Sequence, residues 1–94
     1  METEVKNERI TITDLRLMLK EQGYRCALTG RELTPENCSL DHVLPLCKGG
    51  AHSKDNAQLV VTEANKAKGM MTDDEFIQLC QDVVDEHAKK FSKN

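Results

Sequence analysis

The chain has 94 residues, of which 38% are hydrophobic and only 3% aromatic. This length excludes an enzyme with a separate cofactor domain, and so thin an aliphatic core favours help from a metal, a partner chain or a second copy. Thirteen basic residues against 16 acidic ones give a formal net charge of −3, which excludes a polyanion binder driven by bulk charge. Neither a membrane-helix run nor the apolar run of a signal peptide is visible, so we expect a cytoplasmic protein with no membrane partner.

The four cysteines, at positions 26, 38, 47 and 80, contain no C-x2-C pair. Without a secretory segment a disulfide framework has no oxidising compartment in which to form. Their spacing also does not match the usual zinc patterns, which disfavours a metal-storage or metal-sensing protein. We expect free, partly buried thiols, with a scattered zinc site as the alternative.

A first helix is predicted from Thr13, with Thr13 or Asp14 as the N-cap and Gly23 as the stop, because apolar residues between them recur at helical spacing. Residues 1–12 are polar and without periodicity. We therefore predict a flexible lead-in over residues 1–12 and a single domain over residues 13–94.

Two short strands are predicted over residues 24–28 and 39–44, where β-capable residues end at turn formers. A loop rich in Pro and Gly follows over residues 45–56. Residues 59–61 could begin either a strand or a helix. These elements indicate a small α+β fold.

A second helix is predicted from about residue 73 to residue 88, with Thr72 as its N-cap and acidic residues in its first turn. We expect this helix to pack on the rest of the domain through an apolar stripe. The stripe consists of Phe76, Ile77, Leu79, Cys80, Val83 and Val84.

Catalytic residue types are concentrated between positions 40 and 69. Asp41 and His42 end a predicted strand, and together they offer a hard oxygen ligand for a divalent cation and an imidazole that titrates near neutrality. The amide oxygen of Asn65 can complete such a coordination shell without adding charge. Asn56 can hydrogen-bond backbone groups and hold the loop that carries His42.

The order of these residues, DHVLP, then KGG, DNAQLV and NKAKG, resembles the HNH endonuclease family. The family core is a β-hairpin followed by a helix around one divalent metal, the ββα-metal fold, and the resemblance covers roughly residues 24–69. It implies that His42 is the general base and that Asp41 and Asn65 bind one divalent ion, Mg²⁺, Mn²⁺, Ni²⁺ or Zn²⁺. It also implies that Asn56 braces the hairpin loop of the catalytic site, which makes the chain an H-N-N variant.

The chain departs from the family at the structural zinc site. Many members carry two C-x2-C pairs, and the corresponding positions here are Cys26, Thr29, Val61 and Ala64. Because one ligand remains, we expect no structural zinc. The core is then expected to be held by apolar packing of Leu28, Leu40, Leu59 and Val61 with the flanking helices.

Nucleic-acid contacts are predicted near the same segment. Residues 16–69 hold eight basic and six acidic residues, a net charge of +2, which leaves −5 for the rest of the chain. Few aromatic residues are available to stack on single-stranded bases, so we expect double-stranded DNA. The expected phosphate contacts are Lys48, Lys54, Lys66 and Lys68, with His52 as an auxiliary phosphate or metal contact. His87 is expected to cap the C-terminus of the last helix.

The leading hypothesis is therefore a metal-dependent HNH endonuclease that nicks or cuts DNA, acting alone, as a homodimer or with a larger partner protein. Such a small nuclease is compatible with a phage or mobile-element setting. The alternative is a non-catalytic module of the same fold that docks on a larger nucleic-acid-processing partner. The motivation for this alternative is the apolar stripe of the last helix, on so short and so acidic a chain.

Overall fold

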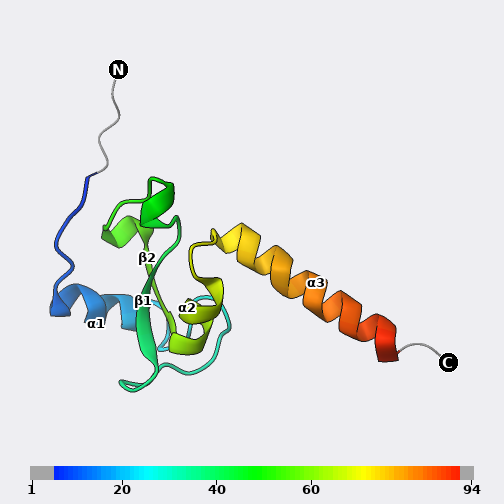
Figure 1. Ribbon diagram of the computed structural model, residues 1–94. Coiled ribbons are helices and arrows are strands. Elements are labelled where there is room, and N and C mark those ends of the chain that lie inside the picture. Colours follow the sequence, from blue (N-terminus) through cyan, green and yellow to red (C-terminus); the bar gives the residue numbers. More distant parts are fainter. Residues whose placement is uncertain (1–5, 92–94) are drawn as a thin grey trace.

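The computed structural model describes residues 6–91, and over these residues it has three α-helices and one two-stranded antiparallel sheet (Figure 1). The predicted α+β class is confirmed. In chain order the elements are α1 (Ile12–Glu21), β1 (Cys38–His42), β2 (Ala57–Val61), α2 (Thr62–Lys68) and α3 (Asp73–Phe91). Two short 3-10 turns, η1 (Leu46–Lys48) and η2 (Lys54–Asn56), lie between the strands.

Helix α1 begins earlier than the sequence pattern predicts. Its N-cap is Thr11, whose hydroxyl accepts a hydrogen bond of 3.1 Å from the Asp14 amide, while the Asp14 carboxylate accepts one of 2.8 Å from the Thr11 amide. This reciprocal capping box satisfies two helix-end donors at once. The prediction of Thr13 or Asp14 as the N-cap is therefore wrong. The predicted stop is confirmed, since the helix ends at Glu21 and Gly23 follows with a φ of 63°.

The segment before α1 is tied to the loop between the strands. The Asn7 side chain accepts a 2.8 Å hydrogen bond from the His52 amide, and the Glu8 carboxylate accepts one of 2.7 Å from the Lys54 amide. These contacts place residues 7 and 8 against the loop, and the flexibility of the lead-in over residues 1–12 stays a prediction. Residues 1–5 lie outside the described part of the chain.

The strand predicted over residues 24–28 does not form. Tyr24 adopts a left-handed backbone conformation with a φ of 59°, and the chain then turns so tightly that the Gly30 amide donates to the Cys26 carbonyl at 2.9 Å. A single bridge between Arg25 and Glu32 is all the pairing that this turn leaves room for. A tight turn has outweighed the β-propensity of the segment.

The sheet is the centre of the fold. Cys38 of β1 pairs with Val61 of β2, and His42 at the other end pairs with Ala57. The prediction for β1 is thus confirmed to within two residues, and the open segment 59–61 belongs to β2. The predicted packing is confirmed for α1 alone, because Leu59 and Val61 are buried and Leu28, Leu40 and apolar residues of α1 pack against the same cluster.

Helix α3 projects away from the sheet (Figure 1). Thr72 is its N-cap as predicted, and its hydroxyl accepts a 3.2 Å hydrogen bond from the Glu75 amide. The helix runs to Phe91, three residues beyond the predicted end, and none of its residues is buried. The expectation that α3 packs on the core through its apolar stripe is therefore wrong. No helix within residues 6–91 is long and apolar enough to cross a membrane.

Candidate functional site

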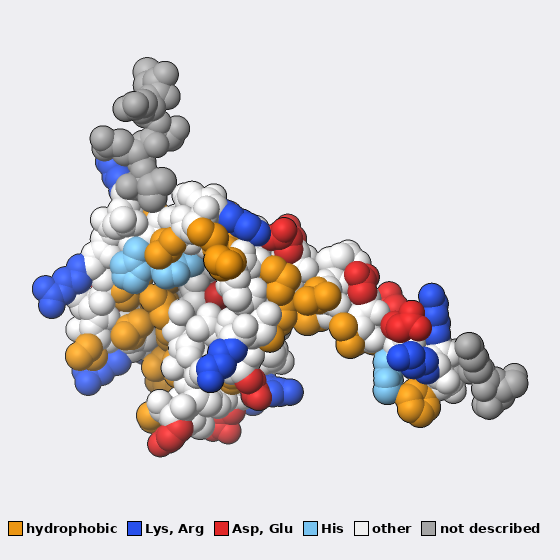
Figure 2. Space-filling view, in the orientation of Figure 1, with side chains coloured by type: hydrophobic (Ala, Val, Ile, Leu, Met, Phe, Trp, Pro, Cys, Tyr) orange, Lys and Arg blue, Asp and Glu red, His pale blue; other side chains and the backbone are white. Residues whose placement is uncertain are grey.

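A cleft of about 230 Å³ lies where the end of β1 meets η1 and the end of α2. Asp41 and His42 line it from β1, and Asn65 lines it from α2. Figure 2 shows histidine side chains on this face of the core, next to hydrophobic ones. Three residues that the sequence predicts to act together thus lie around one cleft, although 24 positions separate the first from the last.

The first of them, Asp41, is buried, with 4% of its surface exposed. Its Oδ2 atom accepts hydrogen bonds of 2.6 Å from Lys68 and 2.9 Å from Gln58, its pairing partner on β2. Both hydrogen bonds that the carboxylate accepts from described residues fall on Oδ2. Since Asp41 also lines the cleft, its Oδ1 atom is the oxygen left for a ligand there.

Lys68 is the second buried charge, and its side chain is fully inaccessible. Its ammonium group lies 2.6 Å from Asp41 Oδ2 and 2.7 Å from Asp73 Oδ1, and it donates to the His42 carbonyl at 2.8 Å. Burial lowers the pKa of Lys68, but the hydrogen bonds and charges of Asp41 and Asp73 outweigh it, and the net pKa is raised. The prediction that Lys68 contacts DNA is therefore wrong, because its ammonium group is buried and paired with two carboxylates of the same chain.

His42 and His52 form a close pair at the edge of the cleft. His42 Nε2 lies 2.9 Å from His52 Nδ1, so one of these two nitrogens donates to the other. Partial burial lowers the pKa of His42, and the electrostatic interaction with His52 lowers it further. The lowered pKa favours the neutral imidazole, the form that a general base requires.

The side chain of Asn56 holds the loop between the strands through hydrogen bonds to its backbone. Its side-chain oxygen accepts a 2.9 Å hydrogen bond from the Leu44 amide, and its side-chain nitrogen donates to the carbonyls of Leu44 and Ala51, each at 2.9 Å. Gly50 lies against the same bridge, and a Cβ atom there would collide with the Leu44 carbonyl oxygen. The bracing contacts expected of Asn56 are therefore present, and they require glycine at position 50.

Three of the four positions that the resemblance assigns to a structural zinc lie in the core, and the fourth, Thr29, is exposed beside it. The Cys26 sulfur accepts hydrogen bonds of 3.4 Å from the Thr29 amide and 3.3 Å from the Val61 amide, while Val61 and Ala64 are buried beside it. Burial raises the pKa of the Cys26 thiol, but these hydrogen bonds more than offset that effect and the net pKa is lowered. Cys26 is the one cysteine among these four positions, and the absence of a structural zinc stays a prediction.

The polar side chains of the cleft determine which divalent ion it can hold. Among residues 6–91 no group of three or more His, Cys, Asp or Glu side chains could hold a metal ion. Asp41 Oδ1 and the Asn65 amide oxygen are two hard donors, which suits Mg²⁺ or Mn²⁺ that keeps several waters and shares substrate phosphate oxygens. The donor set therefore fits a hydrated ion held jointly with a phosphate, and it fits the tetrahedral N and S preference of Zn²⁺ poorly.

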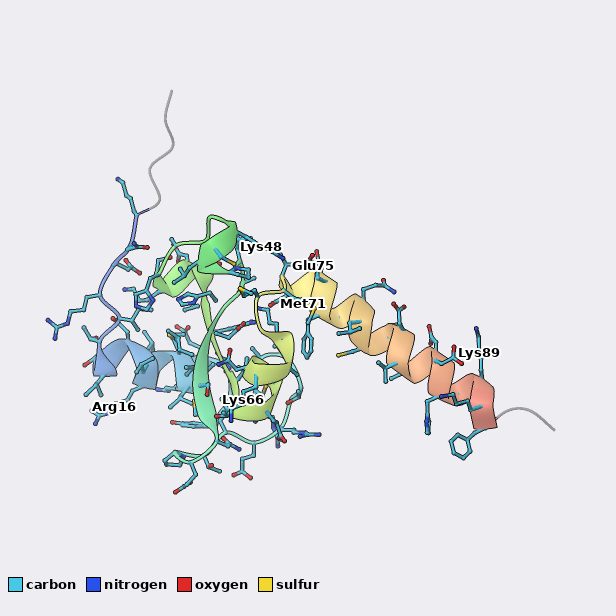
Figure 3. The ribbon with its side chains drawn as sticks, in the orientation of Figure 1. Arg16, Lys48, Lys66, Met71, Glu75 and Lys89 are labelled. Carbon is cyan, nitrogen blue, oxygen red and sulfur yellow. The ribbon has the colours of Figure 1, made fainter. Side chains whose placement is uncertain are left out.

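The three other predicted DNA contacts remain on the surface. Lys48 of η1 pairs with Glu75 at the start of α3, with 2.6 Å between the two charged groups (Figure 3). The ammonium nitrogen of Lys54 lies 3.6 Å from Asp14 Oδ1. Lys66 is exposed on α2, next to Asn65 of the cleft.

Sequence reasoning missed two polar partners of the site. Gln58 donates to Asp41 at 2.9 Å and to Asp73 at 3.1 Å, so it joins both carboxylates that hold Lys68. The composition of β2 could have identified Gln58, since it is the one polar residue of AQLVV. Asp73 has the pattern of an ordinary acidic residue in the first turn of a helix, and nothing in the sequence links it to β1.

No protein-family model matches the chain, and no curated protein matches it.

Proposed function

We propose that the chain is a metal-dependent endonuclease of the HNH type that hydrolyses DNA phosphodiester bonds. The observation that carries this proposal is the cleft, where Asp41, His42 and Asn65 lie around one space of about 230 Å³. The loop that closes it is held by Asn56. A carboxylate, a neutral imidazole and an amide oxygen around one cleft are the groups that metal-assisted hydrolysis of a phosphodiester requires.

His42 is assigned as the general base, and His52 as the residue that positions it. If His42 Nε2 donates its proton to His52 Nδ1, the lone pair of His42 Nδ1 is left to accept a proton from water. The 2.9 Å contact then fixes both the tautomer and the orientation of the ring. Assistance of this kind is typically worth about 10² to 10⁴ in rate.

Asp41 Oδ1 and Asn65 would hold the divalent ion, with Lys68 fixing the Asp41 carboxylate from behind through Oδ2. The bound ion supplies Lewis-acid stabilisation of the charge that develops on the phosphate and the leaving oxygen. Lys68 cannot itself reach a phosphate, since its side chain is fully buried. Its contribution is to keep one carboxylate oxygen occupied and the other directed to the cleft.

The surface lysines Lys48, Lys54 and Lys66 are proposed to contact the DNA backbone. Lys48 and Lys54 lie in the turns of the loop that ends near the cleft, and Lys66 follows Asn65 on α2. Because two of the three already have acidic neighbours, we expect weak, salt-sensitive binding with little sequence preference. The scarcity of aromatic residues favours a double-stranded substrate.

The test is cleavage of supercoiled plasmid with Mg²⁺, Mn²⁺, Ni²⁺ or Zn²⁺, and with EDTA. We compare the wild-type protein with His42→Ala and, as a matched control, with His87→Ala, which removes a histidine of α3 far along the chain from the cleft. We expect metal-dependent nicking that EDTA abolishes, that is lost in His42→Ala and that His87→Ala retains. Equal nicking by His42→Ala and the wild-type protein would overturn the assignment.

A second candidate function has its own supporting observation, the uncovered apolar face of α3. A non-catalytic module that docks through this helix would bind a partner and leave DNA intact. Folded wild-type protein, verified by circular dichroism, that cuts no plasmid with any of the four metals would favour this alternative.

A further inference from the structure

Helix α3 carries a continuous row of residues at alternating spacings of three and four. We call this row the α3 seam, and it consists of Ile77, Cys80, Val84, His87 and Phe91. Such alternation places side chains on one face of a helix, as in the a and d positions of a coiled coil. Ile77 is 57% exposed, Val84 60% and Phe91 74%, so the seam is uncovered in the single chain.

Between Ile77 and Phe91, the acidic residues of α3 avoid the seam. At about 100° per residue, Asp82, Asp85 and Glu86 fall on the opposite face of the helix. Figure 2 shows this segregation along α3, with hydrophobic side chains on one edge and acidic ones on the other. The seam is flanked by the uncharged Gln81 and Ala88, so nothing charged obstructs a second helix in the middle of the face.

The seam continues into a groove at the core end of α3. A cavity of about 300 Å³ is lined by Leu28 and Thr29 of the core and by Ile77, Cys80 and Val84 of the seam. A helix that lies along the seam therefore also meets the core at this end. The groove gives that helix a defined position along α3.

We propose that the α3 seam pairs with the α3 seam of a second copy of the chain, in antiparallel orientation. The helix dipole selects the direction, and the shape of the face selects the partner. Antiparallel pairing opposes the two helix dipoles, whereas parallel pairing aligns them. The seam has a groove beside Ile77 at one end and the exposed ring of Phe91 at the other, so it is complementary to a reversed copy of itself.

The groove at one end of the seam and Phe91 at the other set the proposed register. With Val84 on the two-fold axis, Ile77 of one copy lies opposite Phe91 of the other, because each is seven residues from Val84. Phe91 of the second copy then enters the groove beside Leu28. The arrangement is isologous, so the same contact forms twice and the assembly closes as a dimer. This inference does not depend on the proposed nuclease activity.

The first test is the mass of the full-length chain by size-exclusion light scattering over a concentration series. We expect a species at twice the 10.6 kDa of one chain. Val84→Asp places two buried acids on the axis and is expected to give a monomer. Leu79→Asp is the matched control, since Leu79 is exposed on α3 outside the seam, and it is expected to remain a dimer. A wild-type monomer throughout, or a dimer that survives Val84→Asp, would overturn the proposal.

The second test is the direction of pairing by oxidative cross-linking. Antiparallel pairing separates the two Cys80 residues by eight residues, about 12 Å along the axis, which no disulfide spans. Parallel pairing would bring them face to face. We expect that Val84→Cys with Cys47→Ser and Cys80→Ser forms a linked dimer, and that Cys47→Ser alone does not. Efficient linkage through Cys80 would establish a parallel pair and contradict the antiparallel one.

Discussion

The ammonium group of Lys68 lies 2.6 Å from Asp41 Oδ2, in a pair of side chains that are 0% and 4% exposed. A second carboxylate, that of Asp73, lies 2.7 Å from the same nitrogen. One buried cation thus joins the end of α2 to β1 and to the first residue of α3. Breaking a buried pair of this kind leaves an uncompensated charge, which is far more costly than losing a surface pair.

Replacement of this cation is expected to destabilise the fold. Lys68→Met leaves Asp41 without its charge partner, and the free energy of unfolding should fall by roughly 3 to 5 kcal/mol. The measurement is urea unfolding at pH 7 followed by circular dichroism. Lys66→Met, the exposed neighbour on α2, should change stability by no more than about 0.5 kcal/mol. Unchanged stability of Lys68→Met with weakened DNA binding would instead favour the surface role that the sequence suggested.

The loop bridge of Asn56 makes a separate prediction. Asn56→Ala removes the side-chain hydrogen bonds to the Leu44 amide and to the carbonyls of Leu44 and Ala51. The free energy of unfolding should fall by about 1 to 3 kcal/mol. Asn56→Asp keeps the acceptor for the Leu44 amide but sets a carboxylate against two carbonyls, so it should be no more stable than Asn56→Ala. Hydrogen exchange separates the two variants. The Leu44 amide should stay protected in Asn56→Asp and lose protection in Asn56→Ala, and equal protection in both would contradict the bridge.

The core around Cys26 allows a test of the family resemblance that does not involve catalysis. Replacing Thr29, Val61 and Ala64 together by cysteine supplies four thiols at the family's zinc positions, and the variant should bind one Zn²⁺ per chain. At 1,000-fold excess over the dissociation constant, binding adds about 4 kcal/mol to its stability. The measurements are zinc content after dialysis and Tm with and without zinc. The same triple variant carrying Cys26→Ser is the control and should bind weakly. Equal zinc content in both variants would show that Cys26 does not belong to such a site.

The start of α3 is expected to respond to acid in a defined range. The hydrogen bond from Lys48, followed by those from Thr72, lowers the pKa of Glu75 from 4.5 to about 2. Because the folded pKa is the lower one, the stability that this carboxylate contributes is present above pH 4.5 and is lost as the pH falls from 4.5 towards 2. Carboxyl NMR should give a midpoint near 2 in the wild-type protein, and Lys48→Met should raise it. A wild-type midpoint at 4.5 would rule out the Lys48 contact in solution.

The parts of the fold that local chemistry determines could be predicted from the sequence. β1 and the Thr72 cap depend on neighbouring residues, and the resemblance to the HNH family implied that Asp41, His42 and Asn65 lie around one site. The burial of Lys68 depends instead on its ion pair with Asp73, which forms only when the turn between α2 and α3 brings the two residues together. A lysine on a short polar helix has the same local pattern whether it faces water or two carboxylates.

The uncovered state of α3 was missed for a related reason. An apolar stripe predicts that a helix buries one face, but it does not say against which surface. Here the turn after Lys68 and the anchoring of Asp73 direct the helix outward, so the stripe meets only the residues near Leu28. The strand predicted over residues 24–28 is absent for a similar reason. The tight turn between Cys26 and Gly30 leaves this segment without a partner strand.

The shared ammonium of Lys68 ties the start of α3 to the strand that lines the cleft. The helix extends about 28 Å from Asp73, so a force applied near Phe91 acts on the Asp73 carboxylate through a long arm. The attachment of this helix and one hydrogen bond of Asp41 therefore depend on the same buried cation.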